Sequence, residues 1–137
     1  MTKKYLITVA ILGIWAILML FLDAEVFVSK MDLRSNSVYN LAITSQMVHI
    51  VALLAMTFMN RYLSRSYLNN IYYLFTIGIV LFSGGLYIRA TEGFTNLIIG
   101  FTPLIVYIGA LSLLGGWLMI LITGFTYKHK KRAIQNQ

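Results

Sequence analysis

One histidine is the only ionisable side chain deep inside the long apolar stretches of this sequence. His49 lies within the uncharged stretch 41–60, one helical turn after Ser45 and Gln46. An ionisable group inside a membrane span is a candidate functional site, because placing it in hydrocarbon is costly. The chemistry open to it is proton handling, hydrogen bonding to a ligand, or axial ligation of a haem iron. The alternative is a neutral imidazole that is hydrogen-bonded between helices.

Other catalytic or metal-binding patterns are missing from the sequence. A zinc site needs three or four protein ligands, but the chain has no cysteine and its only other histidine is His129, in the C-terminal tail. All four carboxylates fall between the apolar stretches, at Asp23, Glu25, Asp32 and Glu92. We therefore expect that the protein is not an enzyme and that it has no metal site and no cofactor. His49 with Gln46 stays the one candidate for cofactor binding.

The elements that must position His49 follow from hydropathy. Hydrophobic residues make up 59% of the 137 residues and charged residues 11%, whereas a soluble domain carries about 25% charged residues. A helix needs about 20 apolar residues to cross the hydrocarbon core. Four uncharged stretches reach or approach that length, so the sequence predicts an all-α integral membrane protein with one four-span domain over 1–137. The expected spans are about 5–22, 38–59, 71–88 and 103–125.

Charge distribution predicts the orientation of these spans. Eight of the eleven lysines and arginines lie at the two termini, including the basic tail 128–137, or in the connection 60–70. By the positive-inside rule these segments face the cytoplasm. We expect a compact up-down bundle in a plasma membrane, bacterial in style, with both termini cytoplasmic. This topology accounts for the net charge of +7, so we expect no nucleic-acid partner.

Small and weakly polar residues at helical spacing predict how the spans pack. Thr102 and Pro103 are expected to begin the fourth span, because Thr caps helices and Pro is tolerated in the first turn. The segment 94–101 before them is left open as interfacial, re-entrant or helical. For His49 we expect Gln46 nearby and a partner on the third or fourth span, with Ser83 and Ser112 as candidates. The expected helix-packing residues are Ser45, Gln46, His49, Ser83, Gly84, Gly85, Gly109, Ser112 and Gly116.

Two segments resemble a known family. The stretch 45–54, Ser-Gln-Met-Val-His-Ile-Val-Ala-Leu-Leu, is similar to Tyr-Gln-Met-Tyr-His-Ala-Leu-Ala-Leu-Leu in the membrane proteins of domain of unknown function 423. The stretch 78–87 resembles that family's Gly-Ile-Leu-Leu-Phe-Ser-Gly-Ser-Leu-Tyr, and Thr-Pro and Gly-Trp pairs follow at 102–103 and 116–117. A second family histidine, after the first span, is replaced here by the segment 21–27. The resemblance implies a divergent member with a four-helix membrane fold and no assigned reaction.

Three functions remain open from the sequence. The first is a non-enzymatic multi-pass membrane protein that acts as a helix-packing partner or an envelope-stability factor. The second is a small transporter or channel that uses the His49 face, and the third is a haem- or quinone-associated membrane component. The expected partners are the lipid bilayer and a membrane protein or a second copy of the chain.

Overall fold

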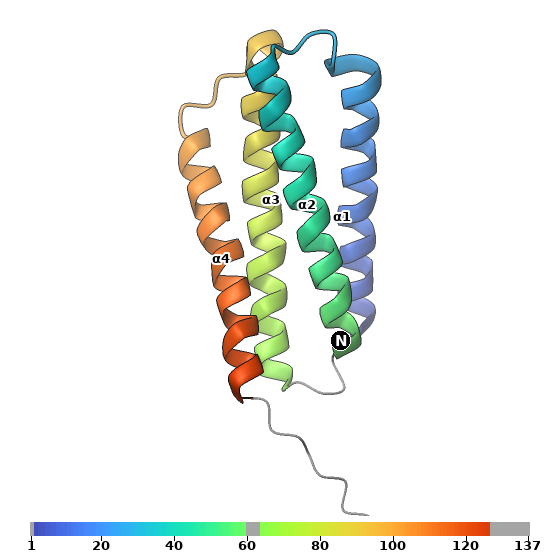
Figure 1. Cartoon of the computed structure of the whole chain (residues 1–137), viewed down its shortest axis with the longest axis vertical. Coiled ribbons are helices and arrows are strands. Elements are labelled where there is room, and N and C mark those ends of the chain that lie inside the picture. The colour runs from blue at the N-terminus through green and yellow to red at the C-terminus, as the bar shows by residue number, and fades with distance from the viewer. Residues whose placement is uncertain (1, 60–63, 127–137) are drawn as a thin grey trace, which may run out of the picture.

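Four long helices make up the computed structural model, which describes residues 2–59 and 64–126. They are α1 (Thr2–Leu22), α2 (Leu33–Phe58), α3 (Arg65–Thr95) and α4 (Thr102–Thr126), and a π-helical turn, η1 (Asp23–Phe27), prolongs α1. Each is long and apolar enough to cross a membrane. Successive helices run in opposite directions, and α1 begins at the end of the bundle where α4 finishes (Figure 1). The tail 128–137 lies outside the described residues.

α2 and α3 are longer than expected, and local caps mark the start of α2 and the end of α3, whereas Ser64 before α3 makes no side-chain cap bond within the described residues. α2 begins five residues before position 38, because the Asp32 carboxylate accepts a hydrogen bond from the Ser35 N–H at 2.8 Å. α3 ends in an αL cap at Asn96, whose φ is 55° and whose N–H bonds to the Glu92 carbonyl at 3.1 Å. Of the segment left open, residues 94 and 95 are therefore helical and 96–101 form the connection to α4.

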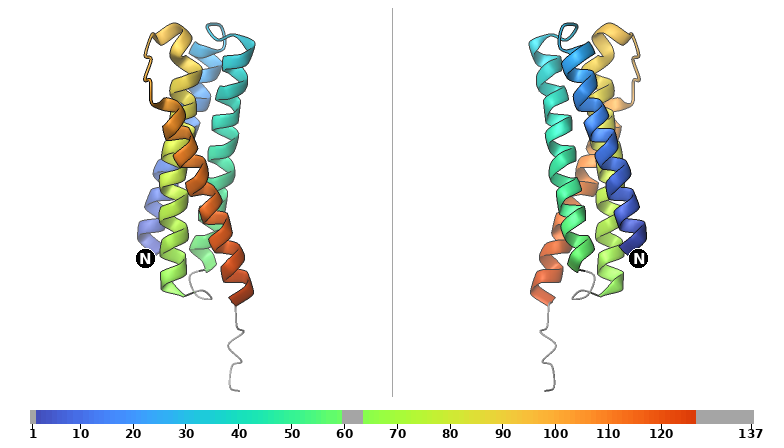
Figure 2. Two further views of the ribbon diagram at one scale, coloured as in Figure 1. Left: turned by 90° about the vertical axis from the view of Figure 1, so that its left-hand side faces the viewer. Right: turned by 90° about the vertical axis from the view of Figure 1, so that its right-hand side faces the viewer.

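α3 is the central helix of the bundle. In its most apolar stretch 50% of the residues are buried, compared with 17% for α1 and for α4. Figure 2 shows α4 inclined across α3. Two apolar clusters fill the interior. One includes Ile50, Phe75 and Leu113, and the other includes Tyr39 and Leu86.

The outer faces of α1 and α4 are almost entirely apolar. Isoleucine, leucine and phenylalanine side chains there are about half exposed or more. Monomeric soluble proteins rarely expose contiguous apolar surface on this scale. The surface of the bundle is therefore suited to lipid rather than water. The residues include Ile11, Ile14, Ile17, Phe21, Leu104, Leu111, Leu114, Leu121 and Phe125.

Candidate functional site

His49 lies on α2 at the edge where α2 meets α4, with α3 beneath. Its ring nitrogen Nδ1 is 2.7 Å from the backbone carbonyl oxygen of Ser45 and 3.5 Å from the Ser45 hydroxyl. Its other nitrogen, Nε2, accepts a hydrogen bond from the indole N–H of Trp117 at 3.1 Å. The side chain is half-buried. His49 thus joins α2 to α4.

These two partners define the form of the imidazole. A carbonyl oxygen only accepts hydrogen bonds, so Nδ1 must carry the hydrogen that is donated to Ser45. The Trp117 indole only donates, so Nε2 must present its lone pair. Only the neutral ring with its hydrogen on Nδ1 meets both requirements. In this arrangement neither nitrogen is free to bind a metal or to exchange a proton.

Two aromatic rings, one from α3 and one from α4, pack against the imidazole. The His49 ring centroid is 5.5 Å from that of Phe75 and 6.0 Å from that of Trp117, with edge-on geometry in both pairs. Phe75 is fully buried, whereas Trp117 is 44% exposed. Gly116 allows this packing, because a Cβ there would lie 2.5 Å from Cδ1 of the Phe75 ring. The cluster therefore opens on the outer surface of the bundle between α2 and α4.

Gln46 belongs to a different network. It is completely buried, and its amide N–H donates to the Leu12 carbonyl oxygen of α1 at 3.1 Å. Its amide oxygen accepts from the Tyr87 hydroxyl of α3 at 2.7 Å. The Gln46 amide thus connects α1, α2 and α3. Along α2 it lies between Ile43, which belongs to one apolar cluster, and Ile50, which belongs to the other. Gln46 and His49 share a stretch of α2 but not a site.

The expected serine partners of His49 are wrong. Ser112 donates instead to the Leu74 carbonyl oxygen at 2.8 Å, which joins α4 to α3. Ser83 is buried, and its hydroxyl has no hydrogen-bond partner within the described ranges 2–59 and 64–126. The partner does lie on the fourth helix, but it is Trp117. Sequence reasoning missed Trp117 and Tyr87 as partners, although both stand in the quoted family segments.

The predicted small-residue faces meet in one seam between α3 and α4. Along α3 the contacting positions step by three, four and three residues, and along α4 they step by the same numbers in the opposite direction. Such 3-4-3 spacing is the repeat of coiled-coil packing. Gly84 instead faces α1, where a Cβ would lie 3.6 Å from the Trp15 ring. The paired positions are Gly85 with Val106, Phe82 with Gly109, Gly78 with Leu113, and Phe75 with Gly116.

The start of α4 is as predicted, but the role of Thr102 differs. α4 begins at Thr102 and Pro103 is its second residue. The Thr102 hydroxyl does not accept from the helix; it donates to the Ile99 carbonyl oxygen at 2.7 Å, to which the Thr102 N–H also bonds at 2.9 Å. Thr102 therefore secures the connection before α4.

Within residues 2–59 and 64–126, no three His, Cys, Asp or Glu side chains come close enough to hold a metal ion. No curated protein and no solved structure matches the chain. A family model described as "Protein of unknown function (DUF423)" matches residues 22–116. That range holds both segments that carried the resemblance and more than half of the 137 residues. This chain therefore belongs to the DUF423 family.

Proposed function

We propose that this chain is an integral protein of a plasma membrane that crosses the bilayer four times, with both termini in the cytoplasm. The four apolar helices and the apolar outer faces of α1 and α4 support insertion. The basic residues gathered at the termini and in the segment 60–70, which includes the first residues of α3, support the orientation.

Within the membrane, the protein acts without catalysis, as a helix-packing partner or an envelope-stability factor. The observation that carries this proposal is that polar side chains between the helices form hydrogen bonds within the chain itself. Gln46, Ser112 and His49 each bond to a neighbouring helix of the same chain. Polar side chains in a membrane interior contribute to helix association in this way. What the molecule offers to other molecules is its outer apolar surface, which fits lipid and the spans of other membrane proteins.

The transporter and haem alternatives both depend on His49. A haem iron or a transported proton needs a ring nitrogen with a free lone pair. Here Nε2 is bonded to Trp117 and Nδ1 to Ser45. Either alternative requires one of these bonds to open first, which favours the structural role.

Replacement of His49 tests the proposal in a strain that lacks the gene. We expect the deletion to raise sensitivity to a membrane-perturbing detergent, and we expect wild type and His49→Gln to restore resistance equally. Gln can still hydrogen-bond across the helix contact, but it cannot ligate haem or shuttle a proton as imidazole does. A His49→Gln protein that accumulates in the membrane at wild-type level but fails to restore resistance would contradict the structural role.

A further inference from the structure

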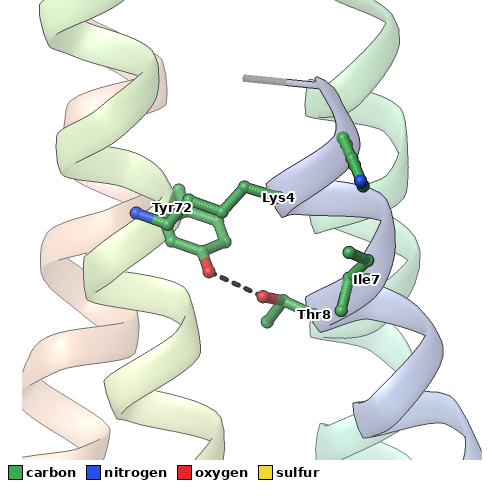
Figure 3. Close-up of a pocket in the computed structure, with 5 residues that line it drawn as sticks. Lys4, Ile7, Thr8 and Tyr72 are labelled. Carbon is green, nitrogen blue, oxygen red and sulfur yellow. Dashed lines mark hydrogen bonds between the residues drawn. The ribbon is translucent and has the colours of Figure 1, made fainter.

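A groove of about 580 Å³ lies between the beginning of α1 and the first part of α3. Its lining combines two lysines, a threonine and a tyrosine with one isoleucine. Figure 3 shows the Tyr72 ring facing α1, with Lys4 extending over it and Thr8 opposite its hydroxyl. The lining residues are Lys3, Lys4, Ile7, Thr8 and Tyr72.

The ammonium group of Lys4 is held in place at this groove. Its Nζ donates a hydrogen bond to the Tyr73 hydroxyl at 2.6 Å. It also lies 4.4 Å from the ring centroid of Tyr73 and 4.9 Å from that of Tyr72, within the range of cation–π attraction. An ammonium has three N–H donors, so two remain for another acceptor. Lys3, the preceding residue, also lines the groove and is exposed, and it adds a second positive charge.

Two hydroxyl groups at the groove supply a further donor. Thr8 Oγ1 and the Tyr72 hydroxyl oxygen are 2.6 Å apart. The pair has two hydrogens and uses one in its mutual bond, so the other is available to a ligand oxygen. Tyr5 packs against Tyr72, with ring centroids 4.6 Å apart, and its hydroxyl donates to the Asn69 side-chain oxygen at 2.9 Å. The donors are thus preorganised on a packed aromatic base.

An exposed apolar strip begins at the same place. On α1 it starts with Ile7 in the groove and continues one and two turns on with Ile11 and Ile14, all on one helix face. On α3, Ile77 and Val80 follow Tyr73 on one face and are likewise exposed. The groove, with its two lysines, is therefore continuous with an exposed apolar strip that runs along the bundle.

We propose that this groove binds one anionic phospholipid, whose phosphate lies at Lys3 and Lys4 and whose acyl chain lies on the isoleucine strip of α1. Charge complementarity selects the occupant, because two ammonium groups and a hydroxyl match phosphate oxygens and the strip matches an acyl chain. Basic pockets between helices near the cytoplasmic face are typical sites for anionic headgroups. The assignment depends on the membrane placement proposed above.

Native mass spectrometry of the full chain in mild detergent tests the site, with dioleoyl phosphatidylglycerol and dioleoyl phosphatidylcholine as probes. We expect wild type to retain one phosphatidylglycerol in preference to phosphatidylcholine. The double variant Lys3→Gln/Lys4→Gln should bind it about thirtyfold more weakly, since each basic side chain near an anionic surface contributes about 1 kcal/mol. Lys3→Arg/Lys4→Arg, which keeps the charge, should retain the lipid.

A matched control removes the same charge elsewhere. Lys130→Gln/Lys131→Gln alters the C-terminal tail and should bind phosphatidylglycerol as wild type does. If the Lys3→Gln/Lys4→Gln variant and the tail variant bound phosphatidylglycerol with equal affinity, the proposed site would be disproved. Competition by inorganic phosphate at the concentration of the lipid would also disprove it, since the occupant would then be a soluble anion.

Alkaline carbonate extraction of cell membranes separates this proposal from the preceding one. A chain that stays in the membrane pellet but shows no difference between the two glutamine variants disproves only the lipid site. A chain released into the supernatant disproves the membrane placement, and the lipid site with it.

Discussion

At the scale of single residues, the buried side chain of Gln46 joins three helices through two hydrogen bonds. The Gln46 amide uses both ends, because its N–H reaches α1 and its oxygen receives the Tyr87 hydroxyl. A buried amide without partners costs about 1–3 kcal/mol, so the benefit of this residue depends on both bonds being made. Gln46 therefore fixes the positions of α1 and α3 relative to α2.

The bond between Gln46 and Tyr87 can be measured with a double-mutant cycle. Tyr87→Phe should lower the free energy of unfolding by about 1–3 kcal/mol, because it leaves the buried Gln46 amide oxygen unpaired, and the coupling energy between the two residues should be about 0.6 kcal/mol, the average for hydrogen bonds between membrane helices. Gln46→Leu should cost about 1–3 kcal/mol, because it leaves the buried Tyr87 hydroxyl unpaired. The double variant should then lose less than the sum of the two, as measured by unfolding in detergent. Strictly additive losses would show that the two side chains do not interact.

At the scale of elements, the apolar stretches of the sequence were enough to predict four helices, because hydropathy is a property of each stretch alone. The start of α2 and the end of α3 were missed because they depend on local caps at Asp32 and Asn96, which lie among polar residues that also suit a loop. The partner of His49 could not be predicted either. Which side chain faces Nε2 depends on the register of α4, and that register follows from the α3–α4 seam.

The cap at Asp32 gives the first turn of α2 a dependence on pH. Hydrogen bonding from Ser35, its side chain first and its backbone N–H second, lowers the pKa of the exposed Asp32 carboxyl below its ordinary value of 3.8. Because the folded-state pKa is lowered, the contribution of the cap is complete above 3.8 and is lost as pH falls through the folded value. Protonation should therefore fray the first turn and leave the rest of α2 intact.

Hydrogen exchange of the Ser35 amide measures this effect. Asp32→Ala should remove the protection of this amide at all pH values, because the carboxylate that accepts its N–H is gone. Asp32→Asn is the control: Asn also caps helices but does not titrate near pH 4, so it should keep a pH-independent protection. If wild type and Asp32→Asn showed the same ratio of protection between pH 6 and pH 3, the carboxylate would not be the titrating group.

The close packing of α3 against α4 predicts the effect of glycine substitutions on stability. A Cβ at Gly109 would lie 2.8 Å from the Cα of Phe82, which is backbone and cannot turn aside. Gly109→Ala should therefore destabilise the protein by about 1–3 kcal/mol, the usual cost of overpacking. Gly85→Leu and Gly116→Leu should also be destabilising through overpacking, since a Cβ would lie 2.7 Å from Cγ2 of Val106 at the first position and 2.5 Å from Cδ1 of Phe75 at the second. Gly13→Ala is the matched control, since a Cβ there meets nothing within 4 Å.

Unfolding in detergent compares the two alanine variants directly. Alanine is favoured over glycine in a helix by about 0.5–1 kcal/mol, so Gly13→Ala should unfold at the wild-type temperature or slightly above it. Gly109→Ala should unfold below it. Equal melting temperatures for Gly109→Ala and wild type would mean that the seam can open without cost.

At the scale of the whole molecule, three properties agree with one placement in a bilayer. The helices alternate in direction, so α1 begins and α4 finishes at the same end of the bundle (Figure 1). Lys3 and Lys4 belong to that end, and the basic tail 128–137 follows α4 in sequence. The acidic residues Asp23, Glu25 and Asp32 belong to the opposite end. A cytoplasmic position for the basic end satisfies the positive-inside rule and also brings the groove of Lys4 to the anionic leaflet.

Single cysteines test this placement without further engineering, because the chain contains no cysteine of its own. Ser29→Cys, in the exposed turn between η1 and α2, should react with a membrane-impermeant maleimide in intact cells. Gln135→Cys, in the basic tail, should react only after the membrane is permeabilised. The reverse pattern would show that the protein is inserted with its basic end outward. The lysine groove would then face the other leaflet, and the positive-inside rule would not govern this chain.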